Sequence, residues 1–135
     1  MDSETLVNSD RDKMVIAGLA VLRHLDSTGF PVAGACWAKG YRWILYLATP
    51  RVDVIGQPEA YGEMLTLLRS SDEVSLTGSD ITLVGMTHPV AGNIRAVQSI
   101  KKAVGRWRDG YPFGGTPFSE MYVYPANIPA EPAAV

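Results

Sequence analysis

The sequence predicts an α+β fold: a two-layer sandwich in which a mainly antiparallel four-stranded sheet packs against three helices, in the order α-β-β-α-β-α-β. Apolar residues recur at helical spacing in three segments, residues 10–26, 58–70 and 90–104. Four shorter apolar segments are bounded by turn-forming residues, which is typical of strands, and they span residues 32–38, 41–49, 81–86 and 121–124. We expect the helices to pack chiefly on one face of the sheet.

The first helix, expected over residues 10–26, has a narrow apolar stripe. Val15, Leu19 and Leu22 align at about 100° per residue and predict its buried face. His24 falls on the opposite side of the helix. We therefore expect His24 to be an exposed residue and not a ligand.

The hairpin over residues 32–49 is the segment around which the rest of the chain is arranged. Residues 39–40, Lys-Gly, predict a two-residue turn that places Trp37 opposite Arg42. Both faces of the hairpin are then apolar, so each face needs a cover. We expect helices over the more aliphatic face. The other face is expected to bind a protein partner or a second copy of the chain, through Trp37, Arg42 and Tyr46.

Length and composition predict one domain. The chain has 135 residues, of which 47% are hydrophobic, and this is sufficient for a closed core without metals or disulfides. We expect a single α+β domain over residues 1–125, with a flexible lead at 1–9, followed by a Pro/Ala-rich tail at 126–135. The apolar run at residues 44–48 is far too short to cross a membrane. One cysteine and an acidic, polar N-terminus favour a cytoplasmic location.

The charge of the chain is small but unevenly distributed. A net charge of −2 argues against a wholly basic nucleic-acid-binding protein. Residues 53–80 carry six acids and one base, whereas residues 90–110 carry five bases and one acid. This pattern predicts an electrically asymmetric molecule.

The basic region suggests a second kind of binding site. At helical spacing, Arg95, Lys102 and Arg106 fall within a narrow arc on the side opposite the apolar stripe of the third helix. Such a stripe is typical of a solvated helix face, and it also suits an anion or nucleic acid. Under the nucleic-acid hypothesis the binding residues are Arg95, Lys102, Arg106 and Arg108, with Trp107 and Tyr111 available for stacking on bases.

Residues with reactive side chains are few. Cys36 lies within an apolar strand, so we expect a buried, unreactive thiol. His88 lies between a strand and a helix, where it either caps the helix or serves as the weak candidate for a catalytic residue. The two histidines and one cysteine do not have the spacing of a zinc site, and no phosphate-binding loop is present. We expect no metal and no cofactor.

Several short patterns in the chain resemble those of a known group of proteins. They are Trp43-x-Leu45, Pro50-x-Val52-Asp53, Gly56-x-x-x-Ala60-Tyr61 and the terminal Tyr122-x-Tyr124. With these patterns the chain resembles a family of small uncharacterised bacterial proteins. The resemblance implies a bacterial or phage origin, and it implies no catalytic residues.

Three functional hypotheses follow from the sequence. The first is a non-catalytic protein-interaction module that dimerises or binds a partner through the apolar hairpin. The second is a nucleic-acid-binding protein that uses the basic third helix and the aromatic loop after it. The third is an enzyme centred on His88. The surplus of apolar hairpin surface favours the first.

Overall fold

The computed structural model describes the backbone of residues 3–40, 42–99, 104–109, 112–113, 116–117 and 120–125. Side chains are described for residues 10–40, 42–99, 104–107 and 120–125. The elements along the chain are α1 (Ser3–Ser27), β1 (Gly34–Lys39), β2 (Trp43–Ala48), α2 (Pro50–Ile55), α3 (Gln57–Leu68), a 3₁₀ turn (Gly78–Asp80), β3 (Ile81–Val84), α4 (Pro89–Gln98), β4 (Trp107–Asp109), β5 (Pro112–Phe113), β6 (Thr116–Pro117) and β7 (Glu120–Val123).

The main sheet confirms the predicted α+β class. Its strand order is β3-β2-β1-β7-β4, and β5 pairs with β6 in a separate two-stranded ribbon. Three of its neighbouring pairs are antiparallel, whereas β2 and β3 are parallel. The parallel pair arises because α2 and α3 connect β2 to β3, and a crossover of that length returns the chain in the same direction. The sheet is therefore mixed, and it contains the edge strand β4 in addition to the four predicted strands.

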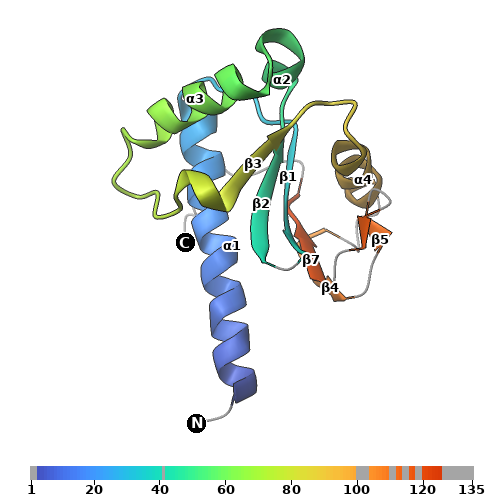
Figure 1. Ribbon diagram of the computed structural model, residues 1–135. Coiled ribbons are helices and arrows are strands. Elements are labelled where there is room, and N and C mark those ends of the chain that lie inside the picture. Colours follow the sequence, from blue (N-terminus) through green and yellow to red (C-terminus); the bar gives the residue numbers. More distant parts are fainter. Residues whose placement is uncertain are drawn as a thin grey trace.

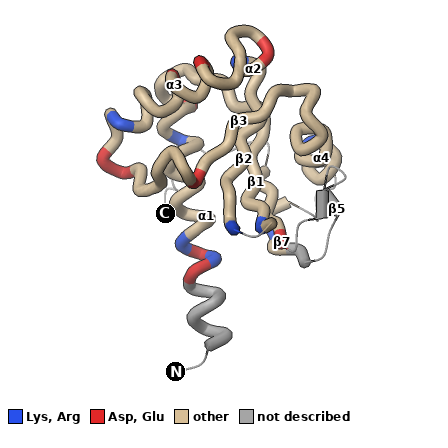
Figure 2. The backbone as a smooth tube through the Cα atoms, in the orientation of Figure 1, with Lys and Arg blue, Asp and Glu red and all other residues tan. Residues whose placement is uncertain are grey.

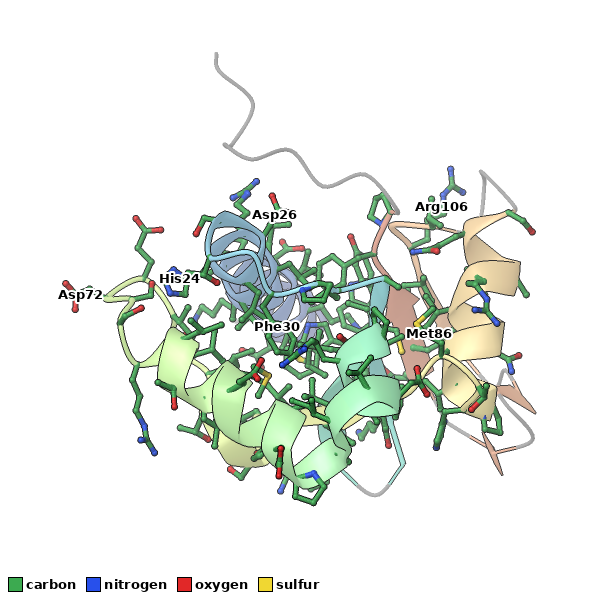
Figure 3. The ribbon with its side chains drawn as sticks, turned by 90° about the horizontal axis from the view of Figure 1, so that it is seen from above. His24, Asp26, Phe30, Asp72, Met86 and Arg106 are labelled. Atoms are coloured by element: carbon green, nitrogen blue, oxygen red, sulfur yellow. The ribbon has the colours of Figure 1, made fainter. Side chains whose placement is uncertain are left out.

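Helices cover both faces of this sheet (Figures 1 and 3). α1 and α3 pack on the first face, over a core that includes Leu45, Leu47 and Met64. α2 joins the same core through Val52 and Ile55. α4 packs on the second face, over a separate core that contains the buried residues Cys36, Ala38, Ala48, Val84, Val90, Ala91, Ile94, Val97, Met121 and Val123. The predicted helices over residues 10–26 and 58–70 thus share one side, together with α2, whereas the predicted helix over residues 90–104 is α4 and covers much of the other side, contrary to the expectation that all three would pack chiefly on one face.

The hairpin register differs from the predicted one. Lys39 pairs with Trp43, so the turn contains three residues, and Trp37 lies opposite Leu45 instead of Arg42. The pairing differs by an odd number of residues, which exchanges the two faces of β1 relative to β2. Trp37 consequently points toward α1, and Cys36 points toward α4. The prediction failed because both faces are apolar, so the hydrophobic pattern does not select one register.

Two helix boundaries also differ from those expected. α1 begins at Ser3, so most of the predicted flexible lead at residues 1–9 is helical. α4 ends at Gln98, and Gly105 has a φ of +71°, which ends helical geometry before residue 106. Arg106 is therefore not a helix residue, and residues 100–103 lie outside the described part of the chain.

His24 is not the exposed residue that the helical wheel predicts. Its side chain is half-buried between α1 and α3, and its Nε2 lies 2.7 Å from the carbonyl oxygen of Leu67 and 3.0 Å from Oγ of Ser70. The carbonyl belongs to the last turn of α3 and also accepts the backbone N–H of Ser70 at 3.2 Å and the hydroxyl of Ser70 at 2.6 Å. His24 thus joins the C-terminal end of α3 to α1.

Candidate interaction surface

An aromatic cluster crosses the first face of the sheet near the β1–β2 turn. Trp37 on β1 pairs with Tyr122 on β7, and Tyr122 pairs with Trp107 on β4, so these three side chains share one face. The ring centroids of Trp107 and Tyr122 are 5.1 Å apart. Trp43, from β2, reaches Trp107 with a centroid distance of 5.2 Å in an edge-to-face arrangement. Although β1 and β7 separate β2 from β4, their tryptophans meet above the sheet.

Two cations lie over the rings of this cluster. The guanidinium of Arg11, on α1, is 5.2 Å from the ring centroid of Trp107 and also forms a 2.6 Å ion pair with Glu120. The ammonium of Lys39 is 5.8 Å from the ring centroid of Trp43. Both distances are within the range of cation–π interactions. We call the partly exposed residues of the cluster, Arg11, Lys39, Trp43, Trp107 and Tyr122, the aromatic surface.

A buried hydrogen-bonded network holds α1 beside the aromatic surface. The indole N–H of Trp37 donates to the carbonyl oxygen of Met14 at 3.0 Å and to Oη of Tyr124 at 3.1 Å. The hydroxyl of Tyr124 donates to the carbonyl oxygen of Val15 at 2.7 Å. Gly18 permits this approach, because a Cβ there would lie 2.2 Å from Oη of Tyr124. The network fixes the backbone of α1 one turn after Arg11, which positions Arg11 over Trp107.

The buried phenol and thiol of the core predict a loss of stability in alkali. Burial raises the pKa of Tyr124 above its ordinary value of 10.0, and burial raises the pKa of Cys36 above its ordinary value of 9.0. The unfolded chain releases these protons at the ordinary values while the folded chain retains them. The contribution of the protonated Cys36 and Tyr124 side chains to stability is therefore complete below about pH 9, and it declines as the pH rises further.

We expect the free energy of unfolding to decrease between about pH 9 and pH 11. Urea denaturation at intervals of one pH unit measures this, and the combined variant Cys36→Ala, Tyr124→Phe should show a shallower decrease. An identical slope in the variant and the wild type would mean that these two groups do not cause the alkaline loss.

The three residues predicted to bind a partner do not share one face. Trp37 is only 3% exposed beneath α1, so the structure removes it from the accessible surface. Arg42 is exposed in the turn, where its Nη2 donates to the carbonyl oxygen of Ser79 at 2.7 Å and lies 3.8 Å from Asp80. Tyr46 is half-buried on the α4 side, where burial raises the pKa of its phenol. Trp37 and Tyr46 lie on opposite faces because the hairpin pairing differs from the predicted one by an odd number of residues.

The residues of the nucleic-acid hypothesis are also divided. Arg95 is exposed on α4 and Arg106 is exposed near the same side of the sheet (Figure 3). Trp107 lies on the opposite face, in contact with α1. Lys102 and Tyr111 lie outside the described residues, as does the side chain of Arg108. The predicted helical stripe of Arg95, Lys102 and Arg106 does not form, because α4 ends before Arg106.

His88 and Cys36 have structural roles in the fold. His88 is the N-cap of α4, and its Nδ1 accepts a hydrogen bond from the backbone N–H of Val90 at 3.1 Å. Because Nδ1 is the acceptor, the neutral imidazole carries its proton on Nε2. Cys36 is fully buried. Among the residues whose side chains are described, no three histidine, cysteine or acidic side chains form a group that could hold a metal ion.

The acidic residues gather on a different side of the molecule. Figure 2 shows most of the red positions along α2, α3 and the loop that follows α3, as the uneven charge of residues 53–80 predicts. Two of the carboxylates there are tied to neighbouring groups. Glu63 forms a bidentate pair with Arg51, and Asp53 accepts the backbone N–H of Met86 at 2.9 Å.

Most of the aromatic surface is not evident from the sequence. The sequence predicts Trp107 as a stacking residue, but it does not indicate Arg11, Lys39, Trp43 or Tyr122 as site residues. The alternation of Tyr122 and Tyr124 does indicate that both rings lie on one face of a strand. No local pattern indicates that β4 and β7 lie beside β1, which is the pairing that assembles the cluster.

Comparisons with known proteins give no match to a family model, a curated protein or a solved structure. The functional assignment is therefore based on the geometry of the surface alone. In the described part of the chain, no helix combines the length and apolar character needed to cross a membrane.

Proposed function

We infer that this protein is a non-catalytic interaction module that binds a protein partner through the end of its β1–β2 hairpin, with the aromatic surface as the principal contact. The observation that supports this most strongly is the convergence of Trp43, Trp107 and Tyr122, all partly exposed, beneath two cations. Tryptophan, tyrosine and arginine are the residue types that contribute most often to the binding energy of protein interfaces.

The same end of the hairpin also presents apolar groups on its other face. Ile44 and Tyr46 are each partly exposed on the α4 side of β2, while Trp43 is partly exposed on the α1 side. Arg42 lies in the turn between them and is itself exposed. The tip of the hairpin thus offers a contact area that extends over both sides of the sheet. We therefore keep the hairpin as the proposed binding element, although Trp37 is buried.

The alternatives have less support from the described residues. His88 and Cys36 are accounted for by helix capping and core packing, so a catalytic role is not needed to explain either one. Nucleic-acid binding through the predicted residues would need Arg95 and Trp107 on one surface, but these two residues belong to opposite faces of the sheet.

Site-specific photo-crosslinking tests the proposal. Benzoylphenylalanine is placed at Arg42, at the tip of the hairpin, and separately at Val54 on α2, which is 73% exposed and serves as the matched control. After irradiation of the cells that naturally contain the protein, we expect one discrete protein adduct, or a dimer, from position 42 and none from position 54.

Three other outcomes would contradict the proposed function. Equal labelling at both positions would show collisional contact only. An absence of any adduct from position 42 would remove the hairpin tip as an interface. An adduct that nuclease shortens would show that the surface binds nucleic acid instead.

A further inference from the structure

The chain itself contains a segment with the chemistry to bind the aromatic surface. Residues 125–135 read PANIPAEPAAV, with Pro129 and Pro132 at the P-x-x-P spacing and Glu131 between them. Such segments favour the polyproline II conformation, and proteins recognise them with clustered aromatic side chains. Residues 126–135 lie outside the described part of the structure, which ends at Pro125.

The segment begins at the end of β7 that lies away from the β1–β2 turn. Pro125 follows Tyr124, whose carbonyl oxygen accepts from Nε2 of Gln98 on α4 and whose ring is 5.1 Å from that of Tyr122, the first ring of the aromatic surface. The ring centroids of Tyr124 and Trp43 are at most about 15 Å apart, because three successive centroid distances of 5.1, 5.1 and 5.2 Å join them through Tyr122 and Trp107. Six residues in the polyproline II conformation span about 19 Å. A tail that turns back after Pro125 is therefore long enough to reach the cations of the surface.

The charges are complementary. Glu131 is the only charged side chain in residues 125–135, and the aromatic surface carries Arg11 and Lys39 over its rings, against the one carboxylate of Glu120 that pairs with Arg11. A carboxylate between the two prolines would approach these cations when the prolines pack on the rings.

We propose that residues 126–135 dock on the aromatic surface of their own chain and compete there with the partner. This proposal rests on the proposed function, because it assigns a regulatory segment to the same surface. A partner must then displace the tail, and the covalent attachment of the tail gives it a local concentration of order millimolar, against which the partner competes.

The indole N–H resonances of the three tryptophans report this docking. The full chain is compared with a chain that ends at Pro125, so that Tyr124 and its hydrogen bonds remain in place. We expect the Trp43 and Trp107 resonances to shift on removal of the tail. Trp37, buried and bonded to Met14 and Tyr124, should not shift and serves as the internal reference. The peptide ANIPAEPAAV, added to the shortened chain, should restore the full-chain positions.

Substitutions in the full chain distinguish specific docking from a general effect of the tail. Pro129→Ala combined with Pro132→Ala, and separately Glu131→Lys, should reproduce the spectrum of the shortened chain, whereas Asn127→Ser should keep that of the wild type. Identical Trp43 and Trp107 resonances in the full and shortened chains would overturn the proposal. That result would leave crosslinking from Arg42 unaffected, so the proposed function and the docking of the tail fail separately.

Discussion

Replacement of Ile94 by alanine is expected to lower the free energy of unfolding by about 2–5 kcal/mol. Ile94 is fully buried on α4, and its Cγ2 occupies the space where a Cβ on Gly34 would lie, at 2.6 Å. The substitution leaves a cavity between α4 and β1 in the second core. Urea denaturation of the two proteins at neutral pH measures the difference.

Ile16→Ala is the matched control for Ile94→Ala. Both substitutions remove the same atoms from a helix, but Ile16 is 66% exposed on α1, so its free energy change should lie within about 0.5 kcal/mol of zero. If Ile94→Ala were as mild as the control, α4 would not be packed on the sheet and the second face would be open, as the sequence alone suggested.

Gly18→Ala is expected to lower the free energy of unfolding by about 1–3 kcal/mol, although alanine is the better helix former. The new methyl group would lie 2.2 Å from Oη of Tyr124 and 3.0 Å from Nε1 of Trp37. Either α1 moves away from the sheet or the buried hydrogen bonds of Tyr124 break. Thermal or urea denaturation measures the change.

Two further variants isolate the cause of this effect. Gly62→Ala, on α3, adds a methyl group with no atom within 4 Å, so it should stabilise the protein by about 0.5–1 kcal/mol. Tyr124→Phe in the Gly18→Ala background removes the clashing hydroxyl and should recover part of the loss. Strictly additive effects of Gly18→Ala and Tyr124→Phe would mean that the two residues do not contact each other.

The elements of the fold could largely be predicted, because their signals are local. The stripe of Val15, Leu19 and Leu22 indicates a helix without reference to the rest of the chain. Pro58, near the start of α3, likewise reflects a local preference. The start of α1 at Ser3 could not be predicted in this way, because residues 3–9 contain too few apolar positions for a helical stripe.

The candidate site could not be predicted, because it depends on pairing between distant strands. Trp37 lies in the core and not on the expected surface, because the turn of the hairpin has one residue more than expected and the strand pairing changes with it. The contact of Trp43 with Trp107 depends on β7 and β4 extending the sheet beyond β1, a non-local arrangement that periodicity does not reveal. His88 was predictable as a helix cap, since its position before Pro89 is a local signal.

The most direct test of the interaction surface combines the crosslinking probe at Arg42 with substitution of Trp43. Trp43→Ala removes the ring that connects the hairpin tip to Trp107, and Ile16→Ala provides a control that removes a more exposed apolar side chain elsewhere on the α1 side. Provided that the thermal midpoint of each variant shows it to be folded, we predict loss of the adduct with Trp43→Ala and its full retention with Ile16→Ala. An undiminished adduct in folded Trp43→Ala would contradict the assignment of the aromatic surface as the binding site.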